Sequence, residues 1–270
     1  MSDAANRDAR RAAFERAAAG YERAAVLQAE VQERLLERLE LTTIAPRRIL
    51  DLGAGTGRAL GPLARHYPGA AVFAADFAVA MLARARRRGR WFRHFPAAAA
   101  RAETLPFARG SFDLVFSNLM LQWCPDLENV FSEARRILSD RALLLFATLG
   151  PDTLRELRDA WAEVDEHAHV NRFIDMHDLG DALIRAGFVE PVMDVEEITL
   201  TYDQVHDLLR DLKAIGAHNV HADRATGLGG PRRFAAFERA YERFRSDGRL
   251  PATYEVVYGT AWTPIDLPRR

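Results

Sequence analysis

This 270-residue chain has little of several features that would narrow its class. Cys124 is its only cysteine, which excludes an internal disulfide and a zinc site built on several cysteines. No apolar run approaches the ~18 residues of a membrane span. The 37 Lys and Arg residues and the 38 Asp and Glu residues leave a net charge of −1, so a bulk nucleic-acid binder is not indicated. We therefore expect a protein that binds neither nucleic acid nor membranes.

The amino-terminal stretch lacks the features of a targeting signal. Asp3, Asp8 and Glu15 are interspersed among its arginines, and it has no apolar core segment. These features predict a soluble, cytoplasmic protein. Lysine is almost missing too, because Lys213 is the only lysine among the basic residues. Arginine is the side chain suited to two-point capture of carboxylates, so the positions of the arginines matter.

Short apolar runs alternate with helical patterns over the first half of the chain. A helix is expected over residues 24–40, and strands are expected at 48–52, 71–76, within 92–99, at 112–117 and at 142–149. Strands that alternate with helices and are apolar throughout indicate parallel pairing, with both faces of the sheet buried. Further helices are expected at 152–164 and 175–186, and further strands at 192–201 and 253–262.

This pattern predicts an α/β fold with a mostly parallel, seven-stranded sheet, an antiparallel edge strand and helices on both faces. Residues 1–45 are expected to form a helical cap, and residues 46–150 the ligand-binding core. Residues 151–270 are expected to complete the same domain, with a helical insertion at about 202–250 before the last strand.

A glycine motif directly after the first strand is the strongest functional signal. Gly53, Gly55 and Gly57 follow Asp51, and Asp76 ends the next strand. Glycines let the backbone turn sharply and let N–H groups approach a ligand. An acid at the end of a strand commonly accepts hydrogen bonds from a ribose diol. The GxGxG spacing differs from the GxGxxG of pyrophosphate-binding folds and disfavours the alternative of a NAD-dependent reductase.

These residues, followed by Ala102–Phe107 and Ser111–Val115, resemble the class I S-adenosylmethionine (AdoMet)-dependent methyltransferases, which have a Rossmann-like fold. The resemblance covers residues 47–149 and implies AdoMet as the cofactor, without a metal. The cofactor contacts that it implies are Asp51, Gly53, Ala54, Gly55, Gly57, Asp76, Phe77, Met81, Ala102, Glu103, Asn118 and Leu119. Arg101 departs from the pattern, because the family usually has an aspartate there, beside the adenine.

A finer resemblance covers nearly the whole chain. It is carried by the strings Phe14–Ala18 with Tyr21, Phe116–Trp123, Gly150–Leu154, Met176–Leu183, Arg185–Phe188 and Pro251–Tyr258. Together they are similar to the malonyl-acyl-carrier-protein O-methyltransferases of biotin synthesis. The resemblance implies methyl transfer from AdoMet to the free carboxylate of malonyl-acyl carrier protein or malonyl-CoA. Two alternatives remain: an assembly-factor-like protein that modifies arginine, and an AdoMet-binding partner protein without transfer activity.

Such an acceptor is already ionised at neutral pH, so no general base is required. Tyr21, Gln122 and Trp123 are expected to line the catalytic side of the pocket, although Tyr21 has the alternative role of anchoring the amino-terminal helix. Candidate holders of the carboxylate are Arg155, Arg158, His177 and Lys213. Arg232 and Arg233 of the insertion are expected to meet an acidic carrier protein, whereas Arg86 to Arg90 are expected at the far edge of the sheet.

Overall fold

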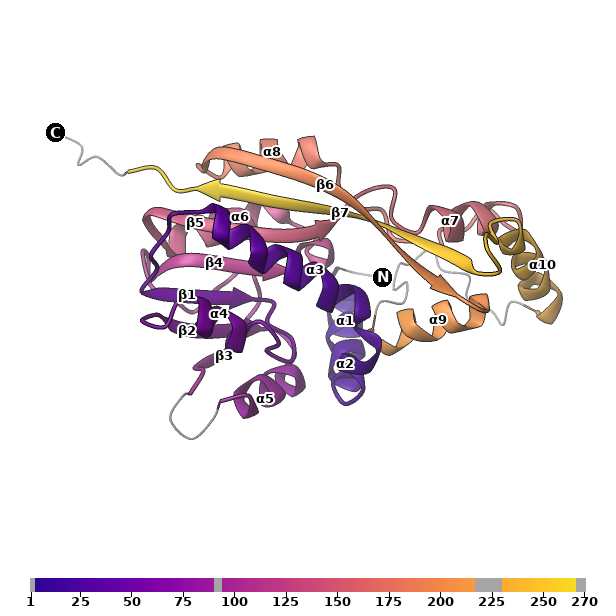
Figure 1. The fold of residues 1–270 in the computed structure, drawn as a ribbon, viewed down its shortest axis with the longest axis horizontal. Coiled ribbons are helices and arrows are strands. Elements are labelled where there is room, and N and C mark those ends of the chain that lie inside the picture. Colours follow the sequence, from indigo (N-terminus) through magenta and orange to yellow (C-terminus); the bar gives the residue numbers. More distant parts are fainter. Residues whose placement is uncertain (1–2, 90–93, 217–229, 266–270) are drawn as a thin grey trace.

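The computed structural model describes residues 3–89, 94–216 and 230–265, in which seven strands form one sheet. The strands are β1 (Arg48–Leu52), β2 (Ala71–Asp76), β3 (Ala97–Ala99), β4 (Phe112–Asn118), β5 (Leu138–Leu149), β6 (Val189–Tyr202) and β7 (Leu250–Trp262). Their order is β3-β2-β1-β4-β5-β7-β6 (Figure 1). β1 to β5 pair in parallel, and β7 is antiparallel to β5 and to β6. The predicted mixed sheet is confirmed, but its antiparallel strand lies one place inside the edge, and β6 is the edge strand.

Helices cover both faces of this sheet. They are α1 (Asp3–Ala17), α2 (Tyr21–Ala24), α3 (Val26–Glu37), α4 (Leu60–His66), α5 (Val79–Arg87), α6 (Leu127–Ile137), α7 (Arg155–Ala162), α8 (Met176–Arg185), α9 (Val205–Ala214) and α10 (Pro231–Glu242), with 3₁₀ turns η1 (Arg38–Leu41) and η2 (Leu121–Trp123). One core takes apolar side chains from α3, α4 and α5, and the other takes them from α6 and α8. Leu114 and Phe116 of β4 face the first core and Val115 faces the second, which explains the continuous apolar run of this strand.

Several elements differ in length from the sequence-based expectation. The helix expected over residues 24–40 is interrupted at Ala25 and ends at Glu37. β5 begins at Leu138 rather than at residue 142, because Leu138 pairs with Phe112 before a register shift. β6 and β7 are each longer than predicted, since they pair with one another from Val189 to the end of β6. Residues 92 and 93 of the third predicted strand lie outside the described residues.

The helical insertion is also present, as α9 and α10, although its residues 217–229 lie outside the described part of the chain. α10 lies at the far end of the long β6–β7 ribbon (Figure 1). It packs against α7, where the Trp161 ring stacks on Phe237 with centroids 4.2 Å apart. Arg233 of α10 is bonded to Asp165, with 2.7 Å from its Nε to Oδ2.

Arg86 to Arg90 were expected at the far edge of the sheet, and this is wrong for Arg88, which directly follows α5. Its Nε donates to the carbonyl of Thr56 in the glycine loop at 2.7 Å, and its guanidinium pairs with Glu22 of α2. The reason is that Gly57 lacks a side chain and lets Ala85 of α5 pack directly on this loop. Arg90 lies outside the described residues.

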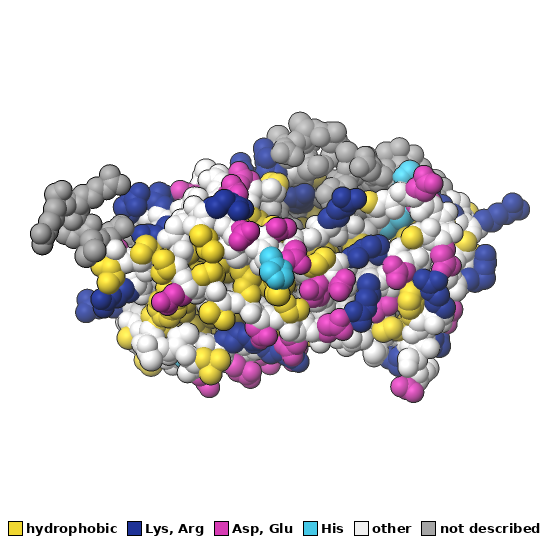
Figure 2. All heavy atoms as spheres, turned by 90° about the horizontal axis from the view of Figure 1, so that it is seen from above, with side chains coloured by type: hydrophobic (Ala, Val, Ile, Leu, Met, Phe, Trp, Pro, Cys, Tyr) yellow, Lys and Arg dark blue, Asp and Glu magenta, His cyan; other side chains and the backbone are white. Residues whose placement is uncertain are grey.

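Figure 2 shows the face formed by α8 and β6, where charged side chains of both signs are interspersed. Ile184 of α8 and Val189, Val192 and Val195 of β6 are exposed there. Among the described residues, no helix has the length and apolar character needed to cross a membrane.

Candidate functional site

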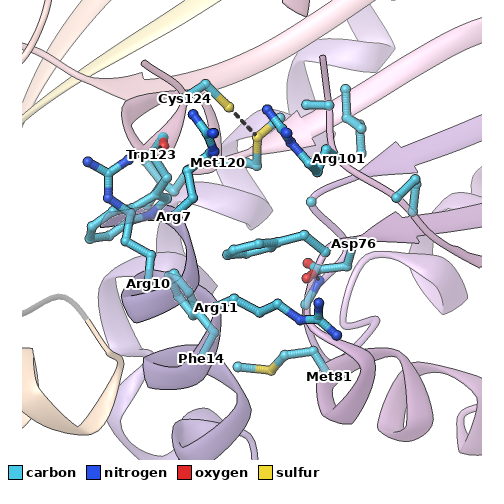
Figure 3. A pocket seen from close by; sticks show the side chains of 18 of the residues that line it. Arg7, Arg10, Arg11, Phe14, Asp76, Met81, Arg101, Met120, Trp123 and Cys124 are labelled. Carbon is cyan, nitrogen blue, oxygen red and sulfur yellow. Dashed lines mark hydrogen bonds between the residues drawn. The ribbon is translucent and has the colours of Figure 1, made fainter. Parts of the chain in front are cut away.

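A cavity of about 420 Å³ opens at the carboxyl ends of β1, β2 and β4, beneath α1. This is the edge at which open α/β sheets place their ligands. Leu52, Gly53, Asp76 and Asn118 line it from the sheet, and α1 contributes the opposite wall (Figure 3). Among the described residues, no group of three or more His, Cys, Asp or Glu side chains is arranged to hold a metal ion.

The three glycines of the motif have different roles. All three have positive φ, and Gly53 and Gly55 line the cavity. A Cβ on Gly53 would come within 2.3 Å of Met120 Cγ, whereas one on Gly55 would meet nothing within 4 Å. Gly57 packs instead against α5, where a Cβ would lie 2.7 Å from that of Ala85. The first two glycines therefore shape the cavity, and the third holds a helix close to the loop.

Asp76 lies at the end of β2, as predicted, and its carboxylate closes the glycine loop. Its Oδ2 accepts from Gly55 N at 2.9 Å, and its Oδ1 accepts from Ala78 N at 2.8 Å. Burial raises the pKa of Asp76 to about 6, although these backbone donors oppose the shift. The carboxylate lines the cavity at the position where a ribose would be expected.

Three buried oxygens beside the glycine loop have no hydrogen-bond partner among the described residues. They are Gln28 Oε1, Asp51 Oδ2 and Asn118 Oδ1. All three side chains line a smaller cavity of about 50 Å³ that adjoins the larger one, together with Ala54 and Tyr21. Burial, and then the charge of Asp76, raise the pKa of Asp51 to about 8. Because unpaired buried acceptors are costly, this group of oxygens is suited to a cationic N–H donor.

Five further predicted cofactor residues line the large cavity. Phe77, Met81, Ala102, Glu103 and Leu119 all line it. Leu119 has φ of 49°, a left-handed conformation that is uncommon for a side chain of its size. Arg101, the position that departs from the resemblance, has its Nε 3.4 Å from Glu103 Oε2.

The residues predicted for the acceptor side separate into two groups. Tyr21 and Trp123 line the large cavity. Gln122 is turned away from it, since its Nε2 donates to the Leu119 carbonyl at 2.7 Å and its Oε1 accepts from Thr148 Oγ1 at 3.3 Å. Burial, together with the nearby charge of Asp76, raises the pKa of the Tyr21 phenol above its ordinary value. Tyr21 is therefore a neutral hydrogen-bonding group at physiological pH.

The candidate carboxylate and carrier residues lie elsewhere. In the part of the chain that the structure describes, none of Arg155, Arg158, His177, Lys213, Arg232 and Arg233 lines the large cavity. Arg155 pairs with Glu197 at 2.5 Å, and His177 Nδ1 lies 2.7 Å from Asp175 Oδ1. Lys213 is two residues from Ile215, which does line the cavity, whereas Arg232 is exposed on α10.

The helix α1 supplies cavity residues that the sequence analysis did not single out. Arg7, Arg10, Arg11 and Phe14 line one wall. Arg10 Nη1 donates to the Trp123 carbonyl at 2.8 Å, and the Phe14 ring contacts Trp123 edge-on at 5.4 Å. Their spacing of three, four and seven residues places them on one helical face. In a stretch known to be helical, this spacing is the sequence signal that would have identified the four residues as one face.

Two of the sequence strings that carry the finer resemblance contact one another outside the cavity. Gly150 N donates to the Glu255 carbonyl at 2.9 Å, and Asp152 N donates to Glu255 Oε2 at 2.6 Å. A Cβ on Gly150 would lie 2.5 Å from Glu255 Cδ, so a larger residue here would displace the Glu255 side chain from this contact. The strings Gly150–Leu154 and Pro251–Tyr258 are therefore linked by packing at the end of β5.

Glu15 fastens α1 over the cavity. Its carboxylate accepts from Val79 N at 2.7 Å and from Ala80 N at 2.8 Å, the first free donors of α5. We predict that Glu15→Ala lowers the free energy of unfolding by about 1 kcal/mol, as the loss of a helix cap does. Urea unfolding measures this change. The matched variant Arg16→Ala, at an exposed position, should leave the stability near that of the unchanged protein, and equal losses in the two variants would contradict the prediction.

Comparison with known proteins agrees with this geometry. A model of a methyltransferase domain matches residues 50–146. The chain is 55% identical to a malonyl-[acyl-carrier protein] O-methyltransferase of Laribacter hongkongensis, over 96% of this chain and 90% of that protein. It is 52% identical to the enzyme of the same name from Gallionella capsiferriformans, over 98% and 93%. The crystal structure of the YcgJ protein from Bacillus subtilis superposes with a TM-score of 0.61 at 16% identity, covering 86% of this chain and 99% of that one, which supports the fold. The chain belongs to the malonyl-[acyl-carrier protein] O-methyltransferase family.

Proposed function

We propose that this protein transfers a methyl group from AdoMet to the free carboxylate of a malonyl thioester carried by acyl carrier protein or CoA. The products are the malonyl methyl ester and S-adenosylhomocysteine, and the family resemblance puts this reaction early in biotin synthesis. The names of the relatives support the acceptor. The observation that carries the cofactor assignment is the group of three unpartnered buried oxygens of Gln28, Asp51 and Asn118 beside the glycine loop.

These residues fit AdoMet. Its α-ammonium would meet the acceptor oxygens of Gln28, Asp51 and Asn118, which have no hydrogen-bond partner in the described part of the chain. Asp76 would accept hydrogen bonds from the ribose hydroxyls, and Ala102 and Glu103 would flank the adenine. When bound, AdoMet supplies a sulfonium methyl group, which an acceptor oxygen takes in an in-line displacement as the C–S bond breaks and its electron pair returns to sulfur.

The protein's own contribution is binding, orientation and exclusion of water. A malonyl carboxylate is ionised at neutral pH, so no residue has to remove a proton from it. Tyr21, whose phenol stays protonated, would donate a hydrogen bond in the acceptor region, and Trp123 would form an apolar wall there. Holding the reacting atoms together in a site shielded from water supplies a large part of such a rate enhancement. We propose that the reaction proceeds in the cytoplasm, without a metal ion.

Tyr21→Phe is expected to lower the rate of methyl transfer about tenfold or more, because the phenolic donor is lost and the ring is retained. AdoMet affinity should persist. The measurement combines labelled AdoMet and malonyl-acyl carrier protein in a turnover assay with AdoMet titration by calorimetry. Unchanged turnover would remove Tyr21 from the mechanism.

The same assay tests the function itself. Formation of a labelled ester that mild alkaline hydrolysis releases is the expected result. A folded protein that binds AdoMet and forms no such ester would overturn the proposed function and favour a non-catalytic AdoMet-binding protein.

A further inference from the structure

The large cavity is divided by charge. Its sheet side carries the buried acids Asp76 and Glu103, with Asp51 in the adjoining smaller cavity, and the more exposed Arg101 beside Glu103. The opposite wall, from α1, carries Arg7, Arg10 and Arg11 together with Asp8, so three cations stand there against one acid. Figure 3 shows Arg7 and Arg10 beside Trp123, across the cavity from Asp76. A cationic ligand is therefore favoured on the sheet side and an anionic one on the side of α1.

We infer that Arg7 and Arg10 of α1 form a binding subsite for a carboxylate, which receives the free carboxyl group of the acceptor. This inference rests on the proposed function, in which AdoMet occupies the acidic side and the malonyl group must lie opposite. An Arg guanidinium binds a carboxylate by charge-assisted hydrogen bonds. A guanidinium that engages one carboxylate oxygen leaves the other oxygen free to react.

Arg10 is fixed in position for this role. Its Nη1 donates to the Trp123 carbonyl at 2.8 Å, a contact between residues far apart in the chain. No other hydrogen bond of this guanidinium is found among the described residues, so its remaining N–H groups can serve a ligand. Arg10 is half-buried, so a charge contact there is screened less than one on the open surface. Trp123, one of the two predicted acceptor residues that line the cavity, is its direct neighbour.

The other two cavity arginines are engaged by acids. Arg11 Nε lies 3.8 Å from Glu15 Oε1, and Figure 3 shows its side chain extended toward Asp76. Arg101 Nε lies 3.4 Å from Glu103 Oε2. Arg7 lines the cavity one turn before Arg10 and Arg11, and it completes the basic side of the wall.

If the subsite exists, the protein should bind an acceptor with a free carboxylate more tightly than one without it, and a binding experiment without turnover can measure this preference. The protein is loaded with S-adenosylhomocysteine, and malonyl-CoA and acetyl-CoA are titrated by calorimetry. The two thioesters share the whole CoA moiety and differ in the terminal carboxylate, so the ratio of their affinities measures the contribution of that carboxylate to binding. We expect the unchanged protein to favour malonyl-CoA at least tenfold, and the double variant Arg7→Gln/Arg10→Gln to lose most of this preference, as removal of a charge-assisted hydrogen bond does.

Arg16→Gln is the matched control. Arg16 lies on the same helix, is exposed, and stands on the side opposite to Arg7, since nine residues correspond to two and a half turns. The same change of side chain there should keep the ratio of the unchanged protein. Arg10→Lys, which retains the charge, should keep part of the preference. A merely structural role of Arg10 would weaken both thioesters equally and leave the ratio intact.

The outcomes separate the subsite from the proposed function. A ratio near one in the unchanged protein, or a ratio that the double variant does not lower, overturns the subsite even if methyl ester is formed. A preference for malonyl-CoA that the double variant loses supports the subsite, and it does so even in a protein that forms no methyl ester, where the proposed function alone would fail.

Discussion

Gly57→Ala is expected to lower the free energy of unfolding by about 2–5 kcal/mol, and Gly55→Ala by only about 1–2 kcal/mol. Both glycines have positive φ, which costs any L-residue stability. Only at Gly57 does the added methyl group also collide, at 2.7 Å from Ala85 Cβ and 2.8 Å from its Cα. Neither atom belongs to a flexible side-chain end, so the helix itself must move.

Ligand binding should rank the two variants in the opposite order. Gly55 lines the cavity, and a methyl group there projects into open space where the cofactor is proposed to lie. We expect Gly55→Ala to weaken AdoMet binding about tenfold or more, and the folded fraction of Gly57→Ala to bind nearly as well as the unchanged protein. Urea unfolding and calorimetric titration of both proteins make the comparison. If Gly55→Ala proves the less stable of the two, the assigned roles of the glycines are wrong.

Asp51→Asn is expected to weaken AdoMet binding by about 2 kcal/mol or more, roughly 30-fold, because a buried acceptor for the ammonium loses its charge. The effect should depend on pH. Burial, with the charge of Asp76, raises the pKa of Asp51 to about 8, so this carboxyl group is largely protonated at pH 7 in the free protein. A bound cation favours the ionised form, so binding should release a proton. Affinity should therefore increase as the pH rises from 6 to 7.5.

Calorimetry in two buffers of different ionisation enthalpy measures this released proton. Asp51→Asn should show a much smaller release, with Asp76, whose pKa burial raises to about 6, as the remaining source. A wild-type affinity that is constant over this pH range would contradict the assignment of Asp51 to the ammonium.

Without ligand, the same carboxyl group makes stability depend on pH in the opposite sense. An unfolded Asp ionises near pH 4, whereas Asp51 in the folded protein ionises near 8. Between these values the folded state binds the extra proton, so the free energy of unfolding falls as the pH rises. Asp51→Asn should flatten this slope, and unfolding curves at several pH values check it.

The side of the cavity formed by the glycine loop and the strand ends was predictable because its sequence signals are local. Gly53, Gly55 and Asp76 follow strands whose apolar runs are visible in the sequence, and parallel strands bring their carboxyl ends to one edge. Gln28 escaped notice because it stands on a helix with no motif of its own. Its backbone carbonyl accepts from Asn118 Nδ2 at 2.9 Å, and its side-chain Oε1 is one of the unpartnered oxygens beside the small cavity.

The side of the cavity formed by α1 and Trp123 was less predictable because its contacts join distant segments. The arginines of the insertion were predicted to meet an acidic carrier protein. In the structure, Arg233 is bonded to Asp165, and Arg243 pairs with Glu163. Gln122 adjoins Trp123, which lines the cavity, yet the 3₁₀ turn after β4 directs the Gln122 side chain toward Leu119 and Thr148. Ion pairing and turn direction depend on partners that sequence spacing does not reveal.

By itself, the sequence determined the order of strands and helices, the glycine loop and the acids at the strand ends, because hydrophobic periodicity and turn chemistry act over a few residues. Only the tertiary structure decided which arginines face the cavity. Arg7 and Arg10 are distinguished from other arginines by the docking of α1, which rests on Glu15 at α5 and on Arg10 at Trp123. These contacts span more than sixty residues in each case, and such pairings arise when the chain packs, not from any local pattern.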